Sequence, residues 1–249
     1  MVKGLKTFRE YFQGYEDQYV LIGGAACDIS FGARDMEFRV TRDLDIVLVF
    51  EAQTKEFAER FWEFIRDGKY RNRARSNGRP QFYRFDKPEE AGFPTMIELF
   101  SRAAWDMRPG EILTPVHIDD SVSSLSAILL DDAYYKALLT GRDVIDGVSV
   151  LKPVWLIIFK SKAWLDLNRR MEQGEHVDSR DIKKHRNDIL RMASEIMLES
   201  CTLSEPLKRD MQEFVDKLKV TDAELKNLGI TGVHEGDILD VLKRTYGLM

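Results

Sequence analysis

Residues 40–50 read VTRDLDIVLVF, a stretch in which two aspartates interrupt a run of strand-forming apolar side chains. Successive side chains of a strand point to opposite faces, so Asp43 and Asp45 share one face with Thr41. Valines continue this face, and the alternating leucine, isoleucine and phenylalanine side chains occupy the other. A strand that is apolar on both faces is typical of the centre of a sheet covered by helices. The stretch therefore predicts a central strand over 44–50 with two carboxylates at its beginning.

A metal ion would explain these acids. Carboxylates without a partner are costly in a buried sheet, and a divalent cation removes that cost. Mg²⁺ prefers carboxylate oxygens and completes its coordination with water and phosphate. Glu98 is the only charged side chain in the apolar stretch TMIELFS at 95–101, which predicts another strand. If that strand lies beside 44–50, Glu98 can complete a three-carboxylate Mg²⁺ (or Mn²⁺) site with Asp43 and Asp45.

Plainer interpretations of the same acids remain open. A lone DxD pattern is a weak signal, and it marks more often a strand edge whose aspartates are solvated or paired with Arg39 or Arg42. Glu98 can instead be the ion-pair partner of a buried arginine. The three acids by themselves do not decide between these alternatives and a metal site.

A glycine pair precedes the aspartates. The segment YVLIGG at 19–24 predicts a short strand that ends in Gly23 and Gly24, and AACDISFGAR after it predicts a helix. Because glycine has no Cβ, backbone N–H groups at such a pair can approach a triphosphate closely. A phosphate cradle, paired aspartates and a later strand acid together favour nucleotidyl transfer.

These motifs resemble the nucleotidyltransferase superfamily with a polymerase-β-like core, whose signature is hG[GS], then [DE]h[DE]h and a later strand acid. Here they read IGG at 22–24, DLD at 43–45 and IEL at 97–99. The form T-R-D-L-D is similar to the [ST]xDxD of the AbiEii/AbiGii-type toxins of type IV toxin–antitoxin systems. The resemblance implies an α/β (α+β) core with a mixed sheet, and transfer of an NMP from an NTP. It also implies nucleotide binding by Thr41 and Arg42 beside the glycine pair.

The second half of the chain carries two further motifs of that toxin group. Lys160-Ser-Lys-Ala163 matches Lys-x-x-Ala, and residues 184–188 match Lys-Asp-x-x-Asp except that His185 stands where the family usually has Asp. The resemblance implies that Lys160 and Lys184 bind phosphate. It further implies that Asp188 orients Lys184 or assists the attacking hydroxyl.

The residues themselves leave other roles open for this group. Lys160 follows six apolar residues, so it either meets an anion in a protected place or extends to solvent along its apolar stem. Lys184 and Asp188 can form an ordinary surface ion-pair ladder. Lys162 lies on another helix face and is expected to be solvated, whereas His185 is expected to be a packed or substrate-edge residue rather than a metal ligand.

A basic hairpin is predicted around Asn77-Gly78, the strongest short hairpin signal in the chain. Pro80 places its strand at an edge of the sheet. Alternating arginines of the first strand share one face, and these are Arg71, Arg73 and Arg75. They either bind the phosphates of an acceptor RNA or form a solvated strand edge that prevents pairing with another sheet.

The pattern of the chain changes near residue 151, from short apolar strands to long helical periodicity. We expect a nucleotidyltransferase core domain at 1–151 and an α-helical C-terminal domain at 152–249, with the active site in the cleft between them. The helices of the second domain are predicted near 153–173, 178–199, 205–218, 221–228 and 234–246.

Composition restricts the class of protein. The chain has 249 residues, of which 44% are apolar and 32% charged, as is ordinary for a globular protein. Its net charge of −5 argues against a protein that coats nucleic acid over its whole surface. No apolar stretch is long enough to span a membrane, and the first residues do not contain the apolar core of a signal peptide. Cys27 and Cys201 are expected to be free thiols, which is typical of a reducing compartment. We therefore expect a cytoplasmic protein without a membrane partner.

The expected partners are an NTP, an RNA end or a protein as acceptor, and a cognate antitoxin protein. Two alternatives are retained. One is a drug-modifying nucleotidyltransferase with a small acceptor, and the other is a non-catalytic nucleotide-binding or partner-binding module of the same fold.

Overall fold

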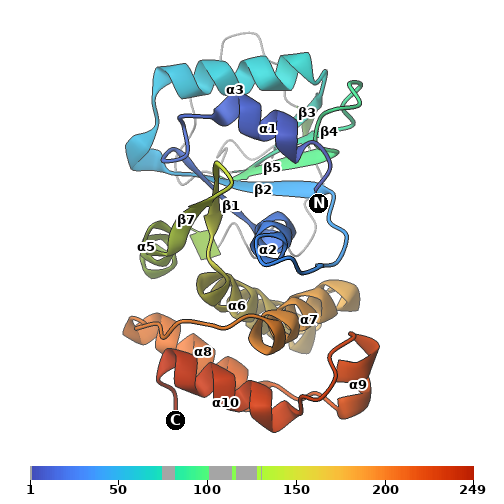
Figure 1. Cartoon of the computed structure of the whole chain (residues 1–249), viewed down its shortest axis with the longest axis vertical. Coiled ribbons are helices and arrows are strands. Elements are labelled where there is room, and N and C mark those ends of the chain that lie inside the picture. Colours follow the sequence, from blue (N-terminus) through green and yellow to red (C-terminus); the bar gives the residue numbers. More distant parts are fainter. Residues whose placement is uncertain (1, 75–81, 101–113, 116–127, 130) are drawn as a thin grey trace. The chain divides into compact units, whose positions relative to one another are not determined.

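The computed structural model describes residues 2–74, 82–100, 114–115, 128–129 and 131–249 (Figure 1). These residues divide into two compact units. One lies within Met1–Ile118 and Leu138–Lys152, and the other within Asp119–Ala137 and Pro153–Met249. The predicted mixed α/β class is confirmed, since the first unit contains a mixed sheet with helices and the second contains helices.

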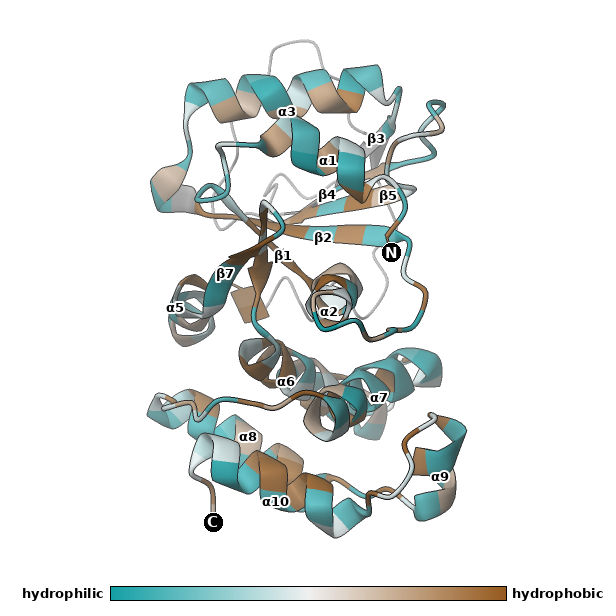
Figure 2. Cartoon of the chain, in the orientation of Figure 1, coloured by the Kyte–Doolittle hydropathy of each residue, from teal (hydrophilic) through white to brown (hydrophobic). Residues whose placement is uncertain are grey.

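The described strands of the first unit form an eight-stranded sheet in the order β6-β3-β4-β5-β2-β1-β8-β7. The strands are β1 (Tyr19–Ile22), β2 (Asp43–Leu48), β3 (Arg71–Ala74), β4 (Phe82–Asp86), β5 (Met96–Phe100), β6 (Thr114–Pro115), β7 (Arg142–Ile145) and β8 (Val148–Leu151). β2 runs parallel to β5 and antiparallel to β1, so the predicted central strand is indeed flanked on both sides. Figure 2 shows hydrophilic residues at one end of β2 and hydrophobic residues along the rest.

Helices cover both faces of this sheet (Figure 1). They are α1 (Leu5–Phe12) and α3 (Lys55–Asp67) on one face and α2 (Gly23–Gly32) on the other, and a short 3-10 turn, η1 (Phe50–Ala52), precedes α3. The ring of Tyr19 packs 5.3 Å from that of Phe8, and Tyr19 pairs in register with Leu48. The side chains of β2 that share a face with Leu48 therefore meet the aromatic layer of α1 and α3. Asp43 and Asp45 point to the opposite face, where α2 lies.

The predicted basic hairpin is present as the antiparallel pair β3 and β4, with Arg73 opposite Arg84. Asn77-Gly78, Pro80 and Arg75 lie outside the described residues. The expectation that the strand after Pro80 is an edge strand is wrong, because β4 lies between β3 and β5. β4 begins at Phe82, after Pro80 in the sequence, so no proline lies among the residues that pair β4 with β3 and β5.

The helices after Pro153 follow their predicted ranges closely. They are α6 (Pro153–Glu172), α7 (Ser179–Glu195), α8 (Glu205–Lys217), α9 (Asp222–Asn227) and α10 (Glu235–Tyr246), and α5 (Asp132–Gly141) has residues in both units. Asp178 caps α7 by accepting from the N–H of Arg180, and Thr221 with Glu224 forms the predicted capping box of α9. None of the helices among the described residues is long and apolar enough to cross a membrane.

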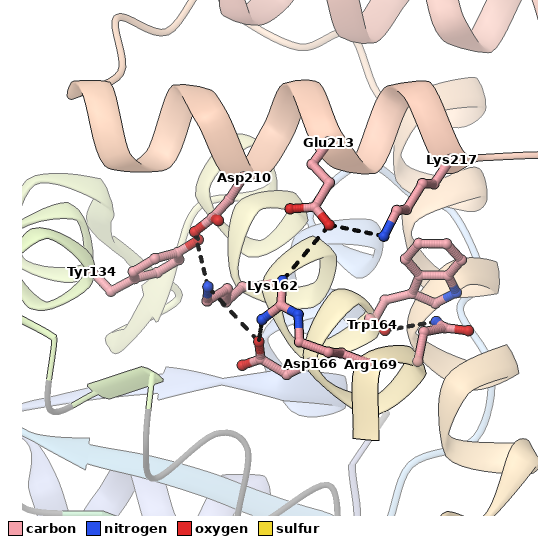
Figure 3. Close-up of polar contacts among 9 residues, drawn as sticks. Tyr134, Lys162, Trp164, Asp166, Arg169, Asp210, Glu213 and Lys217 are labelled. Atoms are coloured by element: carbon pink, nitrogen blue, oxygen red, sulfur yellow. Dashed lines mark hydrogen bonds and ion pairs between the residues drawn. The ribbon is translucent and has the colours of Figure 1, made fainter. Parts of the chain in front are cut away.

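A polar network joins α6 to α8 within the second unit (Figure 3). The Nζ atom of Lys162 lies 3.2 Å from Asp210 Oδ2 and 3.8 Å from Asp166 Oδ1. The hydroxyl of Tyr134 donates to the same Asp210 oxygen at 2.8 Å. The expectation that Lys162 is solvated is therefore wrong, since its side chain is only 22% exposed and lies between two carboxylates.

Candidate active site

The register of the sheet brings the predicted strand acid beside the paired aspartates. Asp45 lies opposite Glu98 on the parallel strand β5, while Asp43 lies opposite Met96. On its other side Asp45 pairs with Ile22, the last residue of β1. Directly opposed residues point to the same face of a sheet, so the side chains of Asp45 and Glu98 lie together. The strand predicted at 95–101 thus takes the position that the metal hypothesis required.

Gly23 is fitted to Asp45. It begins α2 with a φ of +65°, a left-handed conformation that favours glycine. A Cβ atom at this position would overlap Asp45 Oδ2 and lie 2.9 Å from Asp45 Cγ. The absence of a side chain therefore allows the carboxylate of β2 to lie directly against the first residue of α2. The glycine pair belongs to the start of this helix rather than to the end of the strand.

Gly24 is fitted to the segment that leads into β2. A Cβ atom on Gly24 would lie 2.7 Å from Thr41 Oγ1 and 3.2 Å from an Nη atom of Arg39. The Arg39 guanidinium also lies 5.4 Å from the ring centre of Phe38. Arg42, which the resemblance assigned to the nucleotide, is exposed. Arg39 is therefore the arginine that the structure adds to this site.

The N-terminus of α2 has no side-chain cap. Ile22 occupies the N-cap position and makes no side-chain hydrogen bond to the helix. The first N–H groups of a helix carry the positive end of its dipole and lack partners within the helix. Such an end attracts phosphate or carboxylate groups, and here the Asp45 carboxylate lies against it.

Glu98 is held by Arg84. Its Oε1 atom accepts from Arg84 Nε at 2.9 Å and Nη2 at 2.5 Å, and the two residues are opposed on β4 and β5. Both side chains are largely buried. Burial and the Asp45 carboxylate raise the pKa of Glu98 to about 8, against the lowering effect of Arg84. The interpretation of Glu98 as the partner of a buried arginine is confirmed.

The described residues do not form the preformed metal triad that was predicted. No group of three or more His, Cys, Asp and Glu side chains in this part of the chain is arranged to hold a metal ion. Glu98 instead accepts from Arg84 and also shares a hydrogen bond with Asp45. Asp43 and Asp45, both half-buried on one face of β2, offer the hard oxygen donors that suit Mg²⁺ or Mn²⁺. Two carboxylates of the described residues, those of Asp43 and Asp45, are thus suited to bind a cation.

Lys160 and Asp188 form a buried ion pair between α6 and α7. Their Nζ and Oδ2 atoms are 2.8 Å apart, and the side chains are 6% and 0% exposed. The alternative in which Lys160 extends to solvent is therefore wrong. Its charge is compensated by a carboxylate of the same unit, which sequence spacing could not reveal. Lys184 is exposed, and His185 beside it is half-buried.

The basic hairpin contributes one residue to the site that was not assigned there. Arg84, on the second strand, is the residue that binds Glu98. Arg71 is exposed, Arg73 takes the register position opposite Arg84, and Arg75 lies outside the described residues. The alternation of charges predicted the hairpin strands, but only the pairing of β4 with β5 selects the arginine that meets the acid.

Comparisons with known proteins give little further guidance. No protein family model and no curated protein matches the chain. The structure is similar to that of an antigenic nucleotidyltransferase-like protein from Paracoccidioides brasiliensis, with a TM-score of 0.45 and 15% identity over 98% of this chain and 94% of that chain. It is also similar to JHP933 from Helicobacter pylori, with a TM-score of 0.41 and 14% identity over 96% of this chain and 87% of that chain. Similarity at this level assigns neither an activity nor an active site.

Proposed function

We propose that the protein is a Mg²⁺-dependent nucleotidyltransferase that moves an NMP from an NTP to an acceptor hydroxyl or phosphate. The observation that supports this most strongly is the contact of Gly23 with Asp45, which places a carboxylate at the uncapped N-terminus of α2. Helix N-termini bind phosphates through backbone N–H groups. A cation shared by the phosphate and the carboxylate would allow both anions to occupy this place.

The residues around this contact would divide the work of binding. The backbone N–H groups of Gly23 and Gly24 would bind phosphate oxygens, with Thr41 and Arg39 beside Gly24. Asp43 and Asp45 would hold Mg²⁺ or Mn²⁺, which would neutralise the charge that develops on the pyrophosphate leaving group. Arg42, which is exposed, would contact the nucleotide from the solvent side of the site.

In the reaction, an acceptor oxygen would attack the α-phosphorus of the NTP while the bond to pyrophosphate breaks. Glu98 would take the proton of an attacking hydroxyl in its ionised form, and its pKa, raised to about 8, makes that carboxylate a stronger base than an ordinary one. Asp188 is less suited to this role, since it is buried against Lys160. Glu98 would also orient Asp45 through their hydrogen bond. It would become a third metal ligand only by giving up that bond.

The toxin-like form of this proposal adds an acceptor and a partner. Arg71, Arg73 and Arg75 would bind an RNA end, and a cognate antitoxin protein would control the enzyme in the cytoplasm. Of the two lysines that the resemblance assigns to nucleotide phosphates, Lys184 is exposed, whereas Lys160 would first have to leave its buried pair with Asp188. A protein acceptor is the other toxin-like possibility. A small, drug-like acceptor is the competing assignment within the same reaction class.

One observation favours a second function. The Arg84–Glu98 ion pair engages the third acid, and the described residues form no three-carboxylate metal cluster. This arrangement suits a non-catalytic module that binds a nucleotide or a partner protein without turning the nucleotide over.

Transfer of label distinguishes the two functions. The full-length protein is incubated with each α-labelled NTP, Mg²⁺ and bulk RNA, and label is measured in RNA and in protein. We expect label from the α-phosphate, none from the γ-phosphate, and none with Asp43→Ala. The matched control is Asp240→Ala, which removes an exposed carboxylate of α10. Label that persists in the Asp43→Ala variant contradicts the site, and nucleotide binding without any transfer supports the binding module.

A further inference from the structure

A cavity of about 550 Å³ lies in the first unit, and none of the residues assigned above to the candidate site lines it. Its walls come from α1, from the last turns of α2, from the segment between α2 and β2, and from the β7–β8 turn. Its volume falls within the range of roughly 300–1,000 Å³ in which proteins bind small molecules. All of these elements belong to the same unit, so the cavity is a feature of that unit alone.

The segment between α2 and β2 contributes apolar side chains to the wall of the cavity. Met36, Phe38 and Val40 line the cavity together with Glu37, whereas Arg39 and Thr41 lie at Gly24. Phe38 is fixed by packing on Phe31, at 4.9 Å between ring centres. Val40, in contrast, is 84% exposed, so a ligand in the cavity can reach its side chain.

The charged side chains around the cavity indicate the charge of the ligand that it would bind. Its two cationic side chains have partners, since Arg9 Nη1 donates to the backbone carbonyl of Asp146 at 3.3 Å and Lys6 pairs with Glu10 at 3.8 Å. Three carboxylates also line the cavity, from Asp28, Glu37 and Asp146. Three carboxylates against two cations give the lining a formal charge of −1, which favours a positively charged group over a negative one.

We propose that this cavity is a second binding site, for a small amphipathic organic cation. The hydrophobic body of the ligand would pack on Met36, Phe38 and Val40, and its charged end would meet Glu37 and Asp146. This binding does not require the proposed nucleotidyl transfer, because none of the residues that line the cavity takes part in it.

The test uses three probes with one indole body: tryptamine, which is cationic, tryptophol, which is neutral, and indole propionate, which is anionic. Their affinities for the full-length protein are measured by titration followed by NMR, without nucleotide. We expect tryptamine to bind about tenfold more tightly than indole propionate, with tryptophol between them, and to shift the methyl signals of Met36 and Val40. A lack of saturable tryptamine binding, or tighter binding of the anion, would overturn the proposal.

A matched pair of variants locates the site. Gly32 lines the cavity and has open space where a Cβ would be, so Gly32→Phe introduces a bulky side chain at the cavity wall from a position that accepts its Cβ. Gly236 in α10 has the same open surroundings, so Gly236→Phe is the control. We expect Gly32→Phe to weaken tryptamine binding at least about tenfold and Gly236→Phe to leave it unchanged. Equal binding by both variants contradicts the assignment.

A third variant keeps the proposal testable if Gly32→Phe does not fold. Glu37 is an exposed side chain of the cavity wall, so Glu37→Gln changes charge with little effect on folding. We expect this variant to lose part of the preference for tryptamine over indole propionate while its affinity for tryptophol stays the same. An unchanged preference would show that the cavity carboxylates do not select the ligand.

Discussion

Replacing Gly23 by alanine tests the contact on which the proposed site is built. The substitution has two separable effects. A residue other than glycine must adopt the left-handed φ of +65°, and its Cβ would overlap Asp45 Oδ2 and come within 2.9 Å of Asp45 Cγ. Gly14 offers a matched control, because it has a φ of +87° and nothing within 4 Å of its potential Cβ. Gly14→Ala therefore reproduces the backbone strain without the collision.

The expected magnitudes follow from these two effects. Left-handed backbone costs a non-glycine residue about 1–2 kcal/mol, so both variants should lose this much free energy of unfolding. In Gly23→Ala the Asp45 side chain must also turn away and give up its hydrogen bond to Glu98. That loss adds about 0.5–1.5 kcal/mol. Because the carboxylate is displaced by about 1 Å or more, transfer should fall on the order of 100-fold.

Urea unfolding measures the first quantity and label transfer from α-labelled NTP the second. Gly14→Ala is expected to be strained but active, and Gly23→Ala to be slightly less stable and nearly inactive. If Gly23→Ala keeps the activity of Gly14→Ala, the placement of Asp45 against α2 is irrelevant to transfer. If the two variants are equally stable, Asp45 moves without losing a bond.

Other predictions concern the two units separately. Lys160→Met should lower the free energy of unfolding by about 3–5 kcal/mol, because it removes the cation that is paired with the buried Asp188 carboxylate. Adding Asp188→Leu should recover most of that loss, and urea unfolding of the single and double variants measures both effects. Folding raises the pKa of Glu98 from 4.5 to about 8, so between these pH values the folded protein holds a proton that the unfolded chain releases. The wild type should therefore lose stability relative to Glu98→Gln as pH rises through that interval. Melting temperatures of the two proteins that change in parallel with pH would refute this. If RNA is the acceptor, Arg71→Gln should weaken transfer and reduce the slope of log activity against log salt by about 1, whereas a small acceptor predicts little change. Tyr134→Phe should cost about 1 kcal/mol in urea unfolding, since the hydroxyl bonds Asp210.

Local patterns predicted most of the secondary structure. The helices after Pro153 and the caps at Asp178 and Thr221 follow from apolar periodicity and from short-range hydrogen bonds. The central place of β2 follows from its apolar character on both faces. These features depend on residues that are close in sequence, so they can be predicted from short stretches of the chain. The glycine pair was placed one element too early, because a helix that begins in a left-handed glycine has no polar N-cap residue to announce it.

Local patterns did not identify the partners in the buried ion pairs of the two units. Glu98 and Arg84 meet because β4 and β5 pair in one particular register, and a shift by one residue would move one of them to the other face. Lys160 and Asp188 come from different helices, and their contact depends on how α6 packs on α7. The sequence offers Arg39 only as a possible ion-pair partner of the aspartates, because its place at Gly24 depends on the path of an irregular segment.

In the proposed site, nucleotide phosphates and a cation meet between the first turn of α2 and Asp45. Paramagnetic broadening tests it directly. Mn²⁺ is added with a non-hydrolysable NTP analogue to the isotope-labelled protein, and amide signals are followed in the wild type and in Asp45→Asn. We expect selective broadening at Gly23 and Gly24, no broadening at Gly236, and loss of the effect in the variant. Unbroadened signals at Gly23 and Gly24, or the same broadening in Asp45→Asn, would contradict it.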